Sequence, residues 1–171
     1  MRRPMLSVCI SLVSLAAAVT SAAAESATLP TRKAGLWELK TSMDEGGGPR
    51  EQVMKMCISE EMERNTVASS IAEHQTHCTA YNIKPGETST VVEADCVFSR
   101  RKVLSTTTMT GDFKTAFDVK IESTTTDPEA KQQSIVVKRT ILQTGKFLSD
   151  NCGDLKPGEA EGSNGQRMMV Q

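Results

Sequence analysis

The feature that most constrains the fold is an alternation of apolar and polar residues with a period of two. It is clearest over 113–121, where every second position carries one of the set Phe113, Thr115, Phe117, Val119 and Ile121. A period of two places these side chains on one face of an extended strand and the residues between them on the other face. The pattern predicts a sheet with one packed face and one face in water.

Turn-forming residues divide the chain into further segments of the same kind. We expect strands at about 36–43, 53–58, 77–83, 90–98, 102–110, 113–121 and 134–142, with a short one at 147–148. Gly111-Asp112 is typical of a hairpin turn, and Thr144-Gly145 predicts another turn. Consecutive strands joined by turns predict a mainly β fold, an antiparallel meander curled into a half-barrel or a small barrel.

One helix interrupts the series after the second strand. Ser59 suits the N-cap position, and the acidic Glu60 and Glu61 suit the positive end of a helix. We expect this helix over about 60–73. Its apolar positions form a narrow stripe, so it should lie on the sheet without being buried on all sides.

The first 24 residues have the pattern of a secretory signal peptide. Arg2 and Arg3 form a positive start, an uncharged apolar run covers 5–19, and Ala22-Ala23-Ala24 offers the small residues that signal peptidase requires. The run is shorter than the ~20 residues of a membrane-spanning helix. We therefore expect cleavage after Ala24, no transmembrane segment afterwards, and a periplasmic or secreted protein.

The remaining chain divides into three parts. Residues 25–34 are expected to be a flexible leader, and 35–152 a single disulfide-bonded β domain. Gly, Pro and Glu are frequent from residue 153 onward, so we expect a disordered tail over 153–171.

Four cysteines follow the signal segment: Cys57, Cys78, Cys96 and Cys152. An even number in an exported chain predicts two disulfides, and three pairings are open. A turn at 85–87 would fold Cys78 against Cys96. This geometry favours the pair Cys78–Cys96 and leaves Cys57–Cys152.

Several short motifs follow one another along the domain. Gly35-Leu36-Trp37-Glu38 opens it, Cys57-Ile58-Ser59 precedes the acidic helix start, and Cys78, Cys96, the Gly111 turn and Cys152 come later. This order resembles the bacterial exported family catalogued as domain of unknown function 3617, over about residues 34–152. The resemblance implies an envelope location and a disulfide-bonded β fold, and it brings no activity.

Residues that could carry chemistry are few. With 20 basic and 21 acidic residues the chain lacks the basic surface of a nucleic-acid binder. It has two histidines, no Gly-x-Ser-x-Gly elbow and no phosphate-binding glycine loop. We therefore expect no enzyme activity, no catalytic or cofactor-binding residues, and no cofactor. Zinc binding by His74, His77 and Cys78 is an alternative, but the usual paired cysteine spacing is absent.

Two functions fit these observations. The first is a non-catalytic module that binds a small apolar ligand, with Trp37, Met54, Met56 and Phe117 as core or ligand-lining residues. The second is an inhibitor or accessory protein that docks on another envelope protein through a loop such as 44–50 or 126–132. The sequence identifies neither the ligand nor the partner.

Overall fold

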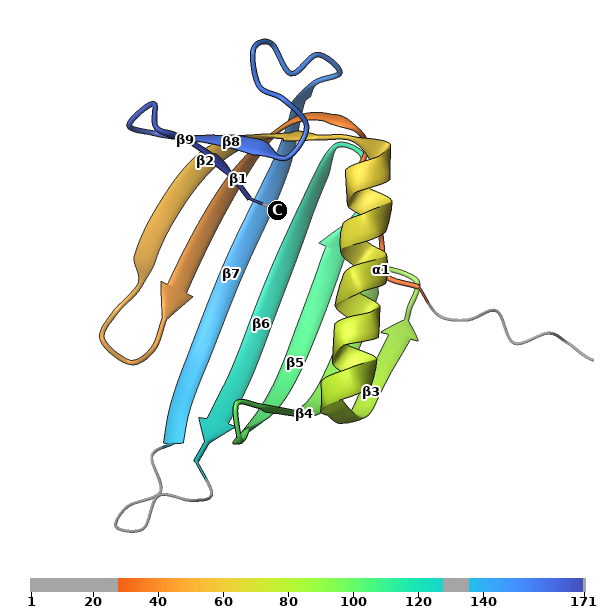
Figure 1. Cartoon of the computed structure of the whole chain (residues 1–171), viewed down its shortest axis with the longest axis vertical. Helices are drawn as coiled ribbons and strands as arrows, with labels where there is room; N and C mark the ends of the chain where they lie inside the picture. The colour runs from red at the N-terminus through yellow and green to blue at the C-terminus, as the bar shows by residue number, and fades with distance from the viewer. Residues whose placement is uncertain (1–27, 128–135, 171) are drawn as a thin grey trace, which may run out of the picture.

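One antiparallel sheet dominates the computed structural model, which describes residues 28–127 and 136–170 (Figure 1). Its nine strands in this part of the chain are β1 (Gly35–Asp44), β2 (Arg50–Ile58), β3 (Cys78–Pro85), β4 (Ser89–Phe98), β5 (Arg101–Gly111), β6 (Ala116–Thr126), β7 (Val136–Ser149), β8 (Glu159–Gly162) and β9 (Arg167–Met169). The helix α1 (Glu60–His77) follows β2. The mainly β fold with one inserted helix is confirmed.

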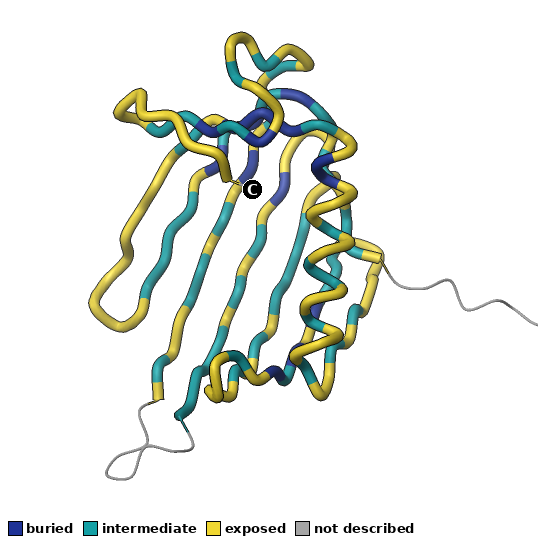
Figure 2. The backbone as a smooth tube through the Cα atoms, in the orientation of Figure 1, coloured by how far each residue is buried: buried dark blue, intermediate teal, exposed yellow. Residues whose placement is uncertain are grey.

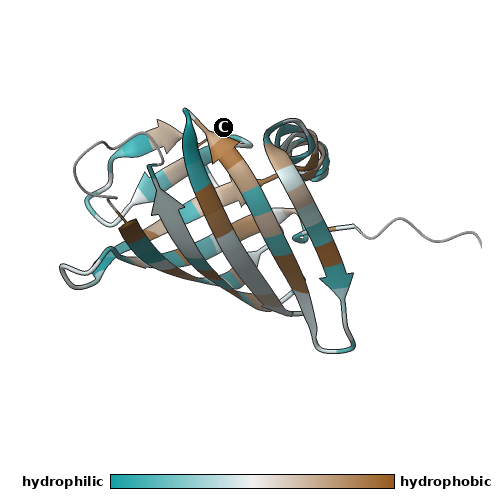
Figure 3. Cartoon of the chain, turned by 90° about the horizontal axis from the view of Figure 1, so that it is seen from below, coloured by the Kyte–Doolittle hydropathy of each residue, from teal (hydrophilic) through white to brown (hydrophobic). Residues whose placement is uncertain are grey.

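The strand order is β3-β4-β5-β6-β7-β1-β2-β8-β9. Strands β3 to β7 form the expected meander, and β1 then pairs with β7 so that the start of the domain lies beside its end. The sheet stays open, with β3 and β9 as its edges. Figure 3 shows it twisted and curled, with α1 along one margin. A curled half-barrel agrees with this arrangement, whereas a closed barrel does not.

The main core lies at one end of the sheet, where buried backbone gathers at the top of Figure 2. Its buried members are Trp37, Leu39, Met56, Ile58, Met62, Phe113, Phe117 and Ala160. Trp37 is fully buried between Phe117 and Phe147, whose ring centroids each lie 5.5 Å from its own. Away from this core most strand residues are half-buried or exposed, apart from the buried Val92, Ala94 and Cys96 of β4, so the main core fills only part of the sheet.

Helix α1 is one turn longer than expected. It begins at Glu60 because the Ser59 hydroxyl accepts a hydrogen bond from the Met62 amide. It continues past residue 73 to His77, and the Cys78 amide caps it by donating to the His74 carbonyl. The chain then passes directly into β3, so no loop residue marks the end of the helix.

Two glycine-containing segments differ from expectation. Gly145 lies inside β7 and forms no turn, because the Phe117 ring occupies the space where a side chain would stand. Phe113 lies in a turn rather than in the strand, with a positive φ of 56°. The turn between β5 and β6 is therefore longer than a two-residue hairpin at Gly111-Asp112.

The expected disordered tail is wrong for residues 153–170. Strand β8 pairs with β2 through Met56 and Ala160, and β9 pairs with β8. Ala160 is 1% exposed, so the segment packs into the core despite its many Gly and Glu residues.

The expected leader is not free at its end. The Lys33 amide donates to the Phe113 carbonyl at 2.8 Å, and Arg32 binds Glu63 of α1. These two contacts fix residues 32 and 33. The signal peptide at 1–24, and residues 25–27 of the leader, lie outside the described residues.

Candidate functional site

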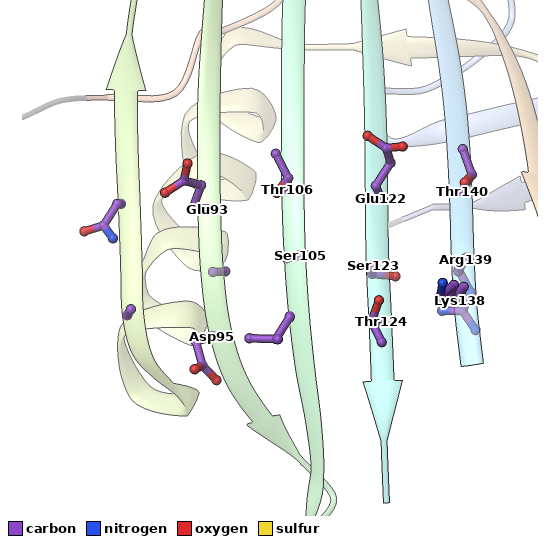
Figure 4. A pocket seen from close by; sticks show the side chains of 14 residues that line it. Glu93, Asp95, Ser105, Thr106, Glu122, Ser123, Thr124, Lys138, Arg139 and Thr140 are labelled. Atoms are coloured by element: carbon purple, nitrogen blue, oxygen red, sulfur yellow. The ribbon is translucent and has the colours of Figure 1, made fainter. Parts of the chain in front are cut away.

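The two faces of the sheet each carry a hollow of ligand size, and these two hollows have opposite chemistry. The first is a broad polar trough of about 640 Å³ on the face away from α1, crossing β3 to β7 (Figure 4). Each of its acidic side chains is neutralised by a lysine: Glu93 by Lys84 at 2.6 Å, Asp95 by Lys102 at 3.1 Å, and Glu122 by Lys120 at 3.0 Å. Exposed pairs of this kind are weak and well hydrated, so the trough is the wet face of the sheet.

The second surface is a groove between α1 and the other face of the sheet, with a volume of about 330 Å³. Its lining residues come from the entry segment, α1, the β5–β6 turn and three strands: Leu29, Pro30, Arg32, Glu63, Thr66, Val67, Ser70, Met109, Phe113, Phe117, Val119 and Gln143. The volume lies at the lower end of the range of natural ligand pockets. We treat this groove as the candidate site.

The floor of the groove is apolar. Met109 on β5 pairs with Val119 on β6, and Phe117 lies two residues before Val119 on the same face of the sheet. Phe113 stacks on Phe117 with parallel rings 5.0 Å apart. Phe113 and Phe117 are themselves buried, so an apolar ligand on this floor would mainly cover the side chains of Met109 and Val119, which the protein leaves half-buried.

The groove stays open because the helix face above it carries small residues. Thr66, Val67 and Ser70 share one face of α1, since residues three and four apart lie together on a helix. None of them is long enough to fill the space above Phe117 and Val119. The packing of α1 is concentrated instead on β3 and β4, where the His74 ring stacks on Tyr81 at 4.7 Å.

A buried ion pair lines one end of the groove. Glu63 is 4% exposed, and its carboxylate accepts hydrogen bonds from the Arg32 amide at 2.9 Å, Nε at 3.0 Å and Nη2 at 2.6 Å. A buried carboxylate needs such partners. The pair fastens the entry segment to the first turns of α1 and so sets the position of the groove wall.

The β5–β6 turn holds Phe113 over the groove. The Asp112 carboxylate accepts from the amides of Thr115 at 2.7 Å, Lys114 at 2.8 Å and Ala116 at 3.2 Å. These bonds to the ionised form, led by the Thr115 amide, hold the pKa of Asp112 well below its usual value. The charged carboxylate thus organises a turn in which Phe113 has a positive φ.

The structure separates the four residues predicted as core or ligand lining. Phe117 lines the groove. Trp37 and Met56 are buried in the core, and Met54 packs against it. The indole Nε1 of Trp37 donates to the Lys33 carbonyl at 2.8 Å, so the one polar atom of this buried side chain already has a partner within the protein.

Sequence reasoning missed Met109, Phe113 and Val67 as lining residues. Val119 and Phe117 belong to the clearest alternating segment, so that signal pointed to the right strand. No pattern in the sequence reports how far α1 stands from the sheet, and this distance creates the groove.

The cysteines form the two pairs that the turn geometry favoured. Cys57 is joined to Cys152, and Cys78 to Cys96. Because Cys78 is bonded to Cys96, its sulfur is not available to the alternative zinc site. His74 and His77 lie instead against aromatic rings, His77 at 5.2 Å from Phe98.

Within the described residues no group of three or more metal-ligating side chains comes together. Over the same ranges, 28–127 and 136–170, no helix has the length and apolar character to cross a bilayer. The basic cluster of Arg100, Arg101 and Lys102 lies at the β4–β5 turn and the start of β5, where Lys102 pairs with Asp95.

A protein-family comparison matches residues 32–152 to the description "Protein of unknown function (DUF3617)". This range covers most of the chain, from the Arg32 that binds Glu63 to the Cys152 that binds Cys57. The chain belongs to the DUF3617 family. No curated protein and no solved structure matches it. For this DUF3617 protein, the lining residues of the groove are therefore the basis for inferring its function.

Proposed function

We propose that this DUF3617 protein is a non-catalytic module of the bacterial envelope that binds a small apolar ligand in the groove between α1 and the sheet. The supporting observation is a difference in side-chain size between the sheet floor of the groove and the face of α1 above it. The floor carries the large side chains of Met109, Phe117 and Val119, whereas the helix above presents small ones. A ligand would supply the apolar contacts that α1 does not.

Further apolar residues extend the floor. Ile121 pairs with Ile141 on β7, which pairs with Met43 on β1. All three are half-buried and share the face of Val119. This row leads away from α1 over a part of the sheet that α1 does not cover (Figure 1), so a ligand longer than the groove would still meet an apolar surface.

Docking through loop 44–50 gains no support from the structure. The loop is held by the Asp44 carboxylate, which accepts from the Gly46 amide at 2.7 Å. It exposes three glycines and charged residues and offers no large apolar side chain to a partner. The loop at 126–132 lies mostly outside the described residues.

Binding of a neutral apolar dye, N-phenyl-1-naphthylamine, tests the proposal. We expect a saturable rise in fluorescence on the wild-type protein. Val67→Phe fills the groove and should weaken dye binding by about tenfold or more. Thr66→Trp fills it from a neighbouring position and should act similarly.

Ala68→Phe is the matched control, because residue 68 is exposed on α1 and does not line the groove. It should bind the dye as the wild type does, with circular dichroism verifying the fold of each variant. Absence of saturable binding to folded wild-type protein would overturn the proposal. Equal binding by Val67→Phe, Thr66→Trp and Ala68→Phe would also overturn it.

A further inference from the structure

A second hollow adjoins the groove and differs from it in charge. We name it the basic vestibule; its volume is about 520 Å³, and its lining residues are Thr31, Arg32, Lys33, Ala34, Glu60, Glu63, Arg64 and Lys114. Arg32 and Glu63 line both the vestibule and the groove. The two hollows therefore meet at the buried ion pair, and one molecule can extend from the first into the second.

The vestibule carries four cationic side chains against two carboxylates. Arg32 is committed to Glu63, and Lys33 pairs with Asp150 at 2.6 Å outside the vestibule. Arg64 reaches Glu60 only at 3.7 Å, with both side chains largely exposed. Such a contact leaves the guanidinium of Arg64 available to a better-placed anion.

Lys114 is the other available cation. Within the described residues its ammonium group makes no ion pair at 4.0 Å or less. The nearest acidic residue in sequence is Asp112, whose oxygens already accept from the Lys114, Thr115 and Ala116 amides and the Thr115 hydroxyl. The vestibule thus presents two cations, Lys114 and Arg64, from opposite sides: the β5–β6 turn and the first turns of α1.

We infer that the ligand is a single-chain anionic amphiphile, a fatty acid, with its chain in the groove and its carboxylate in the vestibule. This inference rests on the proposed function and adds the charge and shape of the ligand. Arg64 and Lys114 bind the carboxylate, for which a guanidinium and an ammonium are suitable donors. The chain lies over Phe117 and Val119 and follows the apolar row towards Ile121 and Ile141.

Three ligands with the same chain and different heads test the inference: decanoate, decanol and decyltrimethylammonium, each titrated below its micelle concentration against displacement of the neutral dye. On the wild type we expect decanoate to bind about tenfold more tightly than decanol, the size that two exposed ion pairs give. Decyltrimethylammonium should bind more weakly than decanol. Raised salt should reduce the preference for decanoate.

The double variant Arg64→Gln with Lys114→Gln should remove the preference while leaving decanol affinity unchanged. Lys55→Gln with Lys146→Gln is the matched control. It removes the same charge from exposed positions on the other face of the sheet and should keep the preference. Equal binding of decanoate and decanol to wild type would overturn the inference while the proposed function stands. Failure of all three ligands and of the dye to bind would overturn both.

Discussion

At the scale of single residues, Gly145 decides how the aromatic core is packed. A Cβ atom at this position would lie 2.0 Å from Cε1 of Phe117. The ring can lie flat over β7 only because the side chain is absent. Phe117 then contacts Trp37 on one side and Phe113 on the other. One missing methyl group therefore sets the position of the groove floor.

Gly145→Ala should push the Phe117 ring out of place and lower the free energy of unfolding by about 1–3 kcal/mol, the usual cost of overpacking. Urea denaturation followed by circular dichroism measures it. Gly47→Ala is the control, because nothing lies within 4 Å of its Cβ position and its φ is not positive. It should leave stability unchanged. A Gly145→Ala protein as stable as the Gly47→Ala protein would contradict the close packing of Phe117 on Gly145.

The sequence predicted Phe117 at a packed position because alternation reports which face of a strand a residue occupies. The turn predicted at Thr144-Gly145 was wrong, since glycine is frequent both in turns and at close contacts within a sheet. Only the residue on the neighbouring strand, here Phe117, shows which of these roles a glycine has. Phe113 was placed in the strand by the same alternation. Its positive φ comes from the bonds to Asp112, which a period of two does not reveal.

At the scale of elements, α1 is attached to the rest of the domain mainly through its first and last turns. Its first turns are held by the Ser59 cap, the burial of Met62 and the Arg32–Glu63 pair. Its last turn contacts Tyr81 and Phe98 through two histidines. Between these ends the helix faces the groove, so binding at the groove leaves the attachments of the helix in place.

Arg32→Ala tests the first attachment. It leaves the Glu63 carboxylate buried without its guanidinium partner, with only the backbone amide of residue 32 still donating to it, so we expect the free energy of unfolding to fall by about 3 kcal/mol. Glu63→Gln added to Arg32→Ala should recover part of the loss, because a neutral amide is less costly to bury. Thermal unfolding of the two variants shows this order. A single variant as stable as the wild type would show that the Arg32–Glu63 pair does not stabilise the attachment of α1.

The strand elements were largely predictable, because alternation, turn residues and the Ser59 cap are local signals. The extra turn of α1 was not, since the next strand was expected to begin at residue 77 and only the Cys78 cap marks the boundary. The disulfide pairs were predictable to the extent that the hairpin at 85–87 brought two cysteines together. The groove was not predictable, because it depends on small side chains of α1 facing large ones from β5, β6 and the turn between them.

At the scale of the whole molecule, the C-terminal hairpin completes the core from the far side of β2. Ala160 lies opposite Met56 and is almost fully buried. The Gly158 amide also donates to the Cys57 carbonyl at 2.9 Å. Composition predicted disorder here because it averages over the segment, whereas two or three well-placed contacts suffice to order it beside a disulfide.

Truncation after Lys156 removes β8 and β9 and exposes Met56. We expect a loss of stability on the order of 2 kcal/mol from the uncovered apolar surface, with the same fold retained. Met169→Ser is the control, because this side chain is 61% exposed and its change leaves β8 in place. Chemical denaturation of both proteins measures the difference. A truncated chain as stable as the full one would mean that the tail contributes nothing to the core.

The β1–β7 pairing has a consequence for synthesis. A ribosome releases β1 and β2 well before β6 and β7 exist, and until then Trp37 has Met56 of β2 opposite it but lacks the rings of Phe117 and Phe147. The meander from β3 to β7 can grow hairpin by hairpin, but the first hairpin must wait for the last meander strand. The nascent chain therefore carries Trp37 without its aromatic partners for most of its elongation, and during that interval aggregation or a chaperone competes with folding.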